Sequence, residues 1–529
     1  MPDSFHPLHL HNSTSALQLS AFIVERMGHI NEERNTLEMP LFETPVAGYS
    51  SVRHQLRLKP GLRFSNGEPF TAQDVASSYL RLHLASVRPE ASTGLRVLAR
   101  CFFLLDQVEV LDARTLELTF SRPVRGEELA PMLANLPLFP HHVSDELLLK
   151  GQAPTLGPYH VMQRTEQPTE QPTEQRTEQR TEQRIELSAN AYYPLGKPKI
   201  EHISLRYVSK PELSELLNIS TAETPQPRLM ILPPSLALAT QPRLDLQVRV
   251  AESRRVLVLG FQQRAGSRFH RNPELRQAIA RLIERKALLK SVPMPDWLRS
   301  PLVGPYVPDR RYEGLMKTLP QLKYDPELAR NLLLKQGYVR SGESLRDARG
   351  QPLVLSLAVD ERVPSGDVLA GVLRDRLTRE GIELRRWTPP VVGGLESGPD
   401  LVLQEWFMDE DEGYTELLHS NGTYNPLGLR DPPLDKLLEL ERRSMLLASR
   451  ERYRREIQTQ LVELAAGLWL WQRRDAVVVQ MPLGVAFKTA AALDPYYLFR
   501  GVHLWQLLTD GPSTAQMPAQ VPLSAEPRP

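Results

Sequence analysis

The segment from Gln404 to Tyr414, QEWFMDEDEGY, brings an aromatic side chain and several carboxylates close together. It overlaps the end of an apolar run, DLVLQEW, which the sequence predicts as a strand. Open α/β sheets bind ligands just beyond the carboxyl ends of their strands. Trp406 could therefore form an apolar wall, and Asp409 could pair with a ligand cation such as a free α-amino group. The alternative is that Trp406 fills the core and the acidic run is a solvated loop.

Two groups of histidines raise the question of a metal site. His6, His9 and His11 lie near the start of the chain, and neutral imidazole is a good ligand for zinc, nickel or copper. No cysteine lies near them, and Asp3 is the one carboxylate nearby. We expect ordinary exposed or hydrogen-bonded histidines here, and also in the adjacent pair at 141–142. No metal site and no cofactor is predicted.

The sequence contains none of the local enzyme signatures that a chain of this size could carry. It has no Gly-x-Ser-x-Gly elbow, no Gly-x4-Gly-Lys-Ser/Thr phosphate loop, no His-Glu-x-x-His helix and no Gly-x-Gly-x-x-Gly turn. These absences favour a binding protein over an enzyme.

The composition is that of an ordinary globular protein. Charged residues make up 24% of the 529 residues, hydrophobic residues make up 41%, and the formal net charge is +1. Such balanced and interleaved charge argues against a general nucleic-acid-binding surface. The single cysteine, Cys101, excludes an intramolecular disulfide, and we expect it to be a small buried hydrophobe. At about 150 residues per domain, the length suggests roughly three units.

The first residues, MPDSFHPLHLHNSTSALQL, lack the basic front and the continuous apolar stretch of a signal peptide. No segment approaches the 18 or so uninterrupted apolar residues of a membrane span. Two locations therefore stay open: the cytoplasm, or an exported protein whose signal precedes this reading frame.

Local patterns predict strands and a helix in the region 47–150. Asn66-Gly67 marks a tight turn, and the residues from Thr71 to Asp74 form a capping box that starts a helix over about 72–84. Two runs alternate between apolar and polar residues, as strands do. The apolar members of these runs are Leu56, Leu58, Leu116, Leu118 and Phe120.

The clearest break in composition lies at 165–184, where TEQP occurs twice and TEQR three times in succession. This tract has no apolar residue to bury. The segments on either side, GPYHVMQ and RIELSAN, alternate like two strands. We predict that the tract lies at the tip of an extended hairpin and is a tolerated surface insertion. The alternative is an arm that binds a partner.

From about residue 250, well-marked helices alternate with apolar strands, which predicts an α/β lobe. The helices are expected from their cap residues and from apolar positions at helical spacing. They are a helix over 273–290 that starts at Pro273, one from Asp325-Pro326 to Gly337, one over about 432–447, and one over about 450–466 that ends at Gly467.

Five stretches stand in a recognisable order along the chain: LRLKPGLRFSNGEPFTAQDV, TLGPYHV with IELSANAYYPLGKPKIEHISLRYV, NPELRQAIARLIERKALL, YDPELARNLLLKQGY, and PLDKLLELERRS with RERYRREIQTQLVEL. Together they resemble the extracellular solute-binding proteins of the oligopeptide, dipeptide and nickel class, which serve ABC importers. The resemblance spans most of the chain.

The resemblance implies an α/β, two-lobed periplasmic-binding-protein fold of class II and the peptide-binding type, with an extra inserted domain. Ligand would be enclosed in the interlobe cleft when the lobes hinge shut. The domains expected on this basis are lobe I over 1–46, 151–250 and 486–529, an inserted small domain over 47–150, and lobe II over 251–485.

The resemblance also names ligand-binding residues. In oligopeptide binders of this family, the aspartate of a Trp-x-x-Asp motif pairs with the amino terminus of the peptide, and Trp406 and Asp409 match that motif. With Tyr159 of the Gly-Pro-Tyr strand, they are the ligand-binding residues that we expect. The chain departs from the family pattern at Leu156, where a glycine is usual, and at Glu284, where an aspartate is usual. These departures leave the fold prediction unchanged.

The leading interpretation is a monomeric receptor of an ABC import system, periplasmic or otherwise extracytoplasmic. It would capture peptides or another amino-bearing solute, deliver them to a permease, and bind no nucleic acid. The alternative is a cytoplasmic ligand-sensing domain related to the transcriptional regulators of sugar-phosphate stress.

Overall fold

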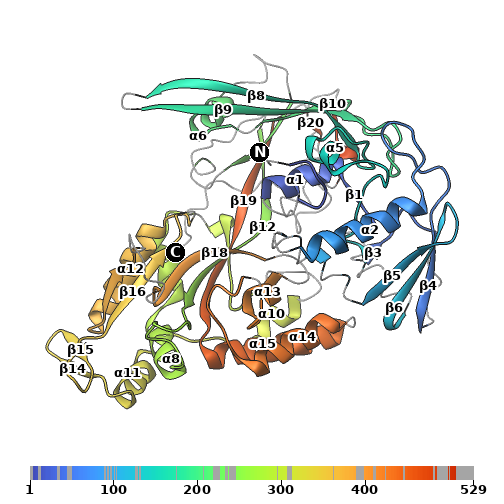
Figure 1. Ribbon diagram of the computed structural model, residues 1–529. Coiled ribbons are helices and arrows are strands. Elements are labelled where there is room, and N and C mark those ends of the chain that lie inside the picture. Colours follow the sequence, from blue (N-terminus) through green and yellow to red (C-terminus); the bar gives the residue numbers. More distant parts are fainter. Residues whose placement is uncertain are drawn as a thin grey trace. The chain divides into compact units, whose positions relative to one another are not determined.

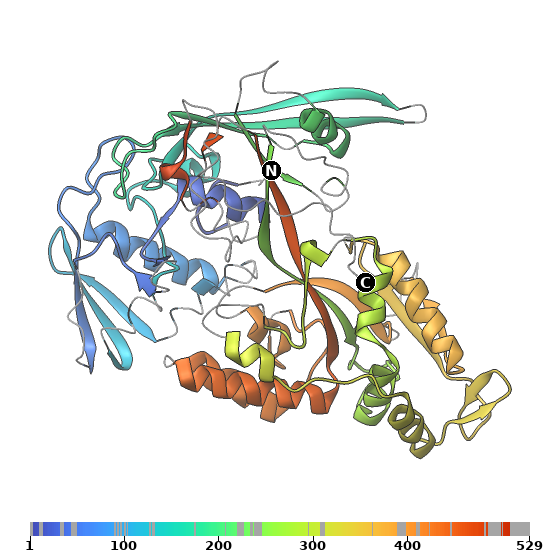
Figure 2. The same ribbon diagram turned by 180° about the vertical axis from the view of Figure 1, so that it is seen from behind.

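Figures 1 and 2 show the computed structural model of the chain from opposite sides. It describes most residues between 4 and 507. The residues that it leaves undescribed are 1–3, 10–13, 32–35, 44–49, 89–90, 92–94, 96–97, 100–101, 103, 126–128, 130–132, 174–175, 207, 219–226, 233–235, 237–245, 295, 307–312, 362, 389–397, 409–412, 423, 445–446, 481–482, 485–498, 500 and 508–529.

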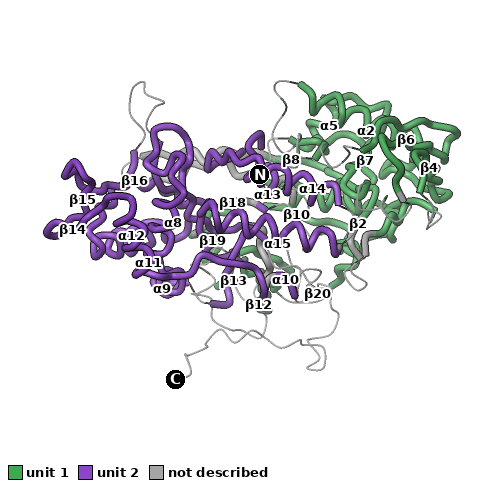
Figure 3. The backbone as a smooth tube through the Cα atoms, turned by 90° about the horizontal axis from the view of Figure 1, so that it is seen from below, with its two compact units in different colours: residues 1–251, 475–529 green, residues 252–474 purple. Residues whose placement is uncertain are grey.

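The chain divides into two compact units (Figure 3). One comprises residues 1–251 with 475–529, and the other comprises residues 252–474. The second unit occupies the region where the sequence predicts lobe II, and it ends earlier than residue 485. The inserted domain expected over 47–150 falls within the first unit and stays a prediction.

Two long strands contain the boundaries between the units. β12 (Leu246–Phe261) passes from the first unit into the second, and β19 (Gly467–Gln480) returns. Runs of valine and leucine suit strands that are covered on both faces. Every residue of β19 is buried except Arg473 and Arg474, which are half-buried and adjoin the boundary.

The second unit is built on an open mixed sheet. β18 (Leu401–Phe407) runs antiparallel to β12 and parallel to β16 (Val354–Val359). β16 also runs parallel to β17 (Glu383–Arg386), and α12 (Gly366–Arg379) makes the crossover between them. One face of α12, made of leucines four residues apart, is buried. The α/β fold class predicted from the sequence is confirmed.

The helix α11 (Pro326–Lys335) starts and ends at the predicted cap residues. The side chain of Asp325 accepts a hydrogen bond from the backbone N–H of Leu328 at 2.9 Å. Gly337, just past the end of the helix, has a φ of +83°. Glycine adopts this left-handed conformation without the steric cost of a Cβ atom, so the helix stops here.

The long helix predicted to start at Pro273 is two helices, so that prediction is wrong in its second half. α8 (Pro273–Leu282) ends at Ile283, whose backbone is extended, and α9 (Arg285–Ser291) follows Glu284. Ile283 is 3% exposed, and the Glu284 carboxylate pairs with Arg376 of α12. These tertiary contacts compensate for the lost helical turn, and local spacing does not reveal them.

The two helices predicted near the end of the second unit are α14 (Pro432–Arg443) and α15 (Leu447–Leu464), which pack side by side (Figure 1). Gly467 does not end α15 as predicted. Ala465 takes the left-handed conformation, with a φ of 44°, and Gly467 begins β19. A Cβ atom on Gly467 would lie 3.1 Å from the carbonyl oxygen of Leu259, so close strand packing is the reason for this glycine.

A small antiparallel sheet of the first unit has the order β4-β6-β5. Its strands are β4 (Ser50–Arg57), β5 (Leu105–Val110) and β6 (Thr115–Arg125). The five alternating apolar residues predicted from the sequence are each 3% exposed or less, so the predicted inward face is confirmed.

α2 (Ala72–Ser86) packs on this sheet and begins at the predicted capping box. The backbone N–H of Thr71 donates to Oδ2 of Asp74 at 2.7 Å, and the hydroxyl of Thr71 donates to the same oxygen at 3.0 Å. The carboxylate thereby satisfies the free donor that precedes the helix.

The TEQ tract lies in a long hairpin made of β8 (Tyr159–Thr173) and β9 (Arg176–Ala189), as predicted (Figures 1 and 2). A third strand, β10 (His202–Arg206), pairs only with residues 184–188 of β9. Among the described residues, the outer part of the hairpin is therefore a ribbon of two strands.

The shorter elements complete the two units. Those of the first unit are α1 (Thr14–Ile23), β1 (Glu25–Arg26), β2 (His29–Asn31), β3 (Thr36–Glu38), β7 (Pro137–Leu138), α5 (Asp145–Lys150), α6 (Lys210–Asn218), β11 (Arg228–Leu232), β20 (Leu483–Gly484), η4 (Val502–Leu504) and β21 (Gln506–Leu507). Those of the second are η1 (Asp296–Leu298), β13 (Arg299–Pro301), α10 (Glu313–Thr318), β14 (Val339–Ser341), β15 (Ser344–Arg346) and α13 (Gly413–Leu418).

His6 is a buried imidazole in the segment that precedes α1. Its ring is 4% exposed and stacks on the ring of His9 with centroids 4.9 Å apart. Nδ1 accepts a hydrogen bond from the N–H of Leu8, and Nε2 lies 3.4 Å from Oδ1 of Asp145. The pKa of His6 is lowered to about 4, chiefly by burial and also by His9 and Arg81, while Asp145 opposes the shift.

We expect the TEQ tract to be dispensable for stability. Arg164 and Ile185 face each other in the hairpin, so an Asn-Gly turn can replace residues 165–184 without a change of register. Because the tract has no apolar residue to bury, the free energy of unfolding should change by less than about 0.5 kcal/mol in urea denaturation. Replacing 163–186 with the same turn is the control; it removes Ile185, which is 1% exposed, and should destabilise clearly. A large loss in the first variant would contradict the inert-insertion interpretation.

Burial of His6 should make the protein sensitive to acid. The unfolded chain binds a proton at His6 near pH 6.5, whereas the folded chain binds it near pH 4. The stabilising contribution of neutral His6 is therefore complete above pH 6.5 and is lost as the pH falls toward 4, by about 2–3 kcal/mol. In urea denaturation at a series of pH values, His6→Gln should flatten this slope. His270→Gln, at an exposed position, is the control and should leave the slope as it is.

Candidate functional site

Two of the three residues predicted to bind ligand belong to β18 or to the segment after it: Trp406 lies in the strand, and Asp409 follows its carboxyl end in the sequence. Because β18 and β16 are parallel, their carboxyl ends lie at the same edge of the sheet, where open α/β sheets bind ligands. Leu401 and Leu403 of β18 are 0% exposed and anchor the strand in the core. The sheet thus determines where the segment after Phe407 begins.

Trp406 lies in the apolar core of the second unit and is 3% exposed. Its ring meets the ring of Trp469 edge to face, with centroids 6.2 Å apart. Among the described residues, neither indole N–H has a hydrogen-bond partner. Met408, two residues further on, is 1% exposed. In this structure Trp406 therefore has the surroundings of a core residue, which is the alternative that the sequence left open.

The acidic part of the predicted site lies outside the described residues. This applies to Asp409 and to the three residues after it, 410–412. Cys101 and His11 also lie outside the described residues. The roles suggested for them stay predictions.

Glu405 is a functional candidate that the sequence analysis did not single out. Its carboxylate is 9% exposed and accepts hydrogen bonds from Nη1 of Arg473 at 3.3 and 3.2 Å. Nη1 of Arg255 lies 3.5 Å away. The three side chains come from β18, β19 and β12, so one buried charge links the site strand to both strands that enter the other unit. The sequence feature that could have identified it is a single glutamate, next to Trp406, within a mostly apolar predicted strand.

Tyr159 is fully buried in the core of the first unit. Its hydroxyl donates a hydrogen bond to the carbonyl oxygen of Ile200 at 2.9 Å, and its ring meets Phe22 edge-on at 6.1 Å. Burial raises the pKa of the phenol well above its usual value. Position 157, two residues before Tyr159, requires a glycine. A Cβ atom on Gly157 would lie 2.5 Å from the backbone of Ile23. In this structure the Gly-Pro-Tyr segment packs the core of its unit.

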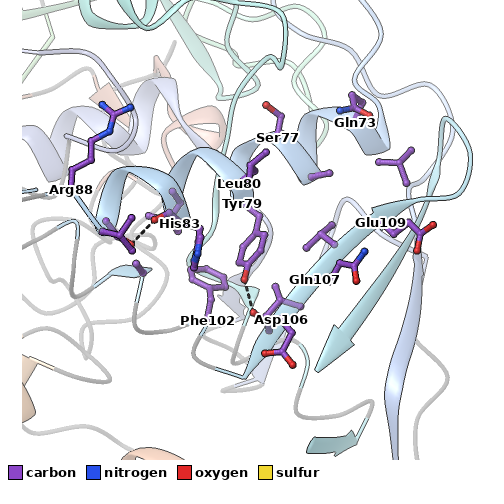
Figure 4. Close-up of a pocket in the computed structure, with 18 residues that line it drawn as sticks. Gln73, Ser77, Tyr79, Leu80, His83, Arg88, Phe102, Asp106, Gln107 and Glu109 are labelled. Carbon is purple, nitrogen blue, oxygen red and sulfur yellow. Dashed lines mark hydrogen bonds between the residues drawn. The ribbon is translucent and has the colours of Figure 1, made fainter. Parts of the chain in front are cut away.

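An open groove of about 1100 Å³ lies in the first unit between α2 and β5 (Figure 4). Leu80 and Val87 line it on the helix side and are 54% and 68% exposed. Asp106 and Glu109 lie on the strand side. The hydroxyl of Tyr79 donates to a β5 carbonyl oxygen, and burial, together with Asp106, raises its pKa. Of the predicted ligand-binding residues that the structure describes, neither Trp406 nor Tyr159 lines this groove.

Within the described part of the chain, no helix combines the length and the apolar character that crossing a bilayer requires.

Comparison with known families gives one match over most of the chain. The family described as bacterial extracellular solute-binding proteins, family 5 Middle, matches residues 53–425. This range includes the Asn66-Gly67 turn, the capping box and Asp409. Comparison with curated proteins gives no match.

Solved structures with a similar fold cover almost the whole chain. NikZ from Campylobacter jejuni, in complex with Ni(L-His), has a TM-score of 0.73 and 16% identity over 96% of this chain and 97% of its own. The ABC transporter substrate-binding protein CtaP from Listeria monocytogenes gives 0.74 and 16% over the same shares. The oligopeptide-binding protein AppA from Bacillus subtilis, in complex with a nonapeptide, gives 0.67 and 15% over 96% and 97%. At these identities the likeness concerns the fold.

Removal of the Glu405 charge should destabilise the second unit. Glu405→Gln removes the charge of a largely buried carboxylate that Arg473 and Arg255 both contact, and we expect a loss of about 2–3 kcal/mol in urea denaturation. The matched control is Asp367→Asn, because Asp367 pairs with Arg386 at 3.1 Å but is 93% exposed. That exposed pair should contribute little. Equal effects of the two substitutions would rule out a structural role for the Glu405 network.

Proposed function

Because this chain belongs to the bacterial extracellular solute-binding proteins of family 5, which are the non-enzymatic binding components of ABC importers, we propose that it captures peptides or another amino-bearing solute. The two-lobed α/β fold of that family accommodates the two units, and the ligand would be held by hinge closure.

The observation that carries the choice of ligand is the segment from Trp406 to Asp409 at the end of β18. The core packing of Trp406 and Met408 holds the end of the strand in place, and the acidic residues follow at once. A carboxylate fixed at this edge of the sheet would bind a ligand ammonium group by a charge-assisted hydrogen bond. It would reject a ligand that lacks the cation, because the charge would then stay unpaired.

The two predicted aromatic residues take different roles in this proposal. Trp406 acts by positioning the strand end, as its packing in the core of the second unit suggests. Tyr159, whose hydroxyl already donates a hydrogen bond to the carbonyl oxygen of Ile200, supports the packing of its own unit.

The setting of the proposed receptor is extracytoplasmic, as the family description suggests, with an ABC permease as its partner. A monomer suits this function, since one chain supplies both units. β12 and β19, which contain the unit boundaries, are the segments about which hinge closure would occur.

Loss of the Asp409 carboxylate should weaken binding of peptides with a free amino terminus. Asp409→Asn keeps the volume and removes the charge, so affinity should fall by about 2–5 kcal/mol in calorimetry with synthetic tri- to pentapeptides. The same peptides with acetylated amino termini should bind weakly to wild type and variant alike. The matched control is Glu410→Gln, which removes the charge of the next residue in the same acidic run.

Unchanged affinity of Asp409→Asn would exclude Asp409 as the partner of the ligand cation, while peptide binding itself would stand. Failure of the wild-type chain to bind any free-amino peptide would overturn the proposed cargo.

A further inference from the structure

Two adjacent histidines meet a buried carboxylate on the surface of the first unit. They are His141 and His142, in the loop after β7, and Asp74, in the first turn of α2. One ligand atom from each of the three residues lies within 4.8 Å of the others. Asp74 is 1% exposed, whereas the imidazoles are 41% and 47% exposed, so an ion in solution can reach the rings.

The loop that carries the histidines is held against α2 by hydrogen bonds on both sides. The N–H of Phe139 donates to the hydroxyl of Ser78 at 3.2 Å. The guanidinium of Arg81 donates to the carbonyl oxygens of His141 and Val143 at 2.9 and 2.8 Å. The backbone that carries both imidazoles is therefore already held in place. This lowers the entropic cost of bringing metal-ligating side chains together.

The two oxygens of Asp74 have separate tasks. Oδ2 accepts the two hydrogen bonds from Thr71 that cap α2. Oδ1 accepts the backbone N–H of His141 at 2.9 Å and lies 2.7 Å from Nδ1 of the same residue. The contact between Oδ1 and Nδ1 is the one that a metal ion can replace, because both atoms are good ligands once the shared proton leaves.

We propose that Asp74, His141 and His142 bind a divalent transition-metal ion of the zinc and nickel class. Two imidazoles and one carboxylate are a ligand set that such ions accept, with a further position open to water or to another carboxylate. The carboxylate of Glu68, whose Oε2 lies 3.2 Å from Nε2 of His142, adds negative charge beside the site. The carboxylates of Asp74 and Glu68 balance the positive charge of the ion. Arg81 repels the ion only weakly, because its own charge is paired with Asp145 at 3.4 Å.

This proposal departs from the expectation that the adjacent histidines are ordinary surface residues, and it is independent of the proposed cargo. The sequence alone does not indicate this metal site, because Asp74 is 67 residues away from His141 and already has a role as a capping residue. It lies within the first unit and involves none of Trp406, Asp409 or Tyr159.

The test is equilibrium dialysis and calorimetry of the full chain, without any affinity tag, against zinc chloride and nickel chloride. We expect one saturable ion per chain, and a weakening of at least about tenfold in each of His141→Gln and His142→Gln. Zinc should raise the melting temperature of the wild type and not that of the two variants. Because both rings are exposed, these variants should fold normally, which circular dichroism checks.

The matched control is the double variant His6→Gln, His9→Gln, which removes the other pair of neighbouring histidines. It should bind zinc as the wild type does. Absence of saturable binding in the wild type, or equal affinity in the wild type and both loop variants, would overturn the proposal. Loss of binding in the control alone would place the ion at the N-terminal histidines and equally refute the site at Asp74.

Discussion

The carboxylate of Glu405 lies between the guanidinium groups of Arg255 and Arg473, and this interaction links three strands that are far apart in the sequence. Removing charges from water is costly, so a largely buried carboxylate is stable only where opposite charges meet it. β18 is thereby attached to β12 and β19, the two strands that contain the unit boundaries. The position of the segment after β18, and with it the proposed ligand site, depends on this attachment.

Apolar packing surrounds two of the candidate residues, Trp406 and Tyr159, each within its own unit. Trp406 and Trp469 meet edge to face in the core of the second unit, and Tyr159 is enclosed with Phe22 in the core of the first. Packing of this kind restrains a strand end, because well-packed interiors deform little. The aromatic residues that the family resemblance pointed to thus contribute rigidity, and the charges after β18 are left to recognise the solute.

The first unit shows how one polar side chain can serve two purposes. Asp74 caps α2 through Oδ2, while Oδ1 faces the exposed imidazole of His141. A carboxylate that is already fixed by a cap is pre-oriented toward a further partner, as the proposed metal site requires. The TEQ hairpin illustrates the opposite case: its strands extend past β10, and their sequence has no apolar residue to bury.

Local chemistry in the sequence was enough to place the start of α2 at its capping box, the limits of α11 at Asp325 and Gly337, and the hairpin around the TEQ tract. Each depends on residues within a few positions of one another, so spacing alone reveals it. Only the tertiary structure decided the break at Ile283, the burial of Trp406, and the meeting of Asp74 with His141. These follow from contacts between residues distant in sequence, whose free energy outweighs local propensity and which no local pattern records.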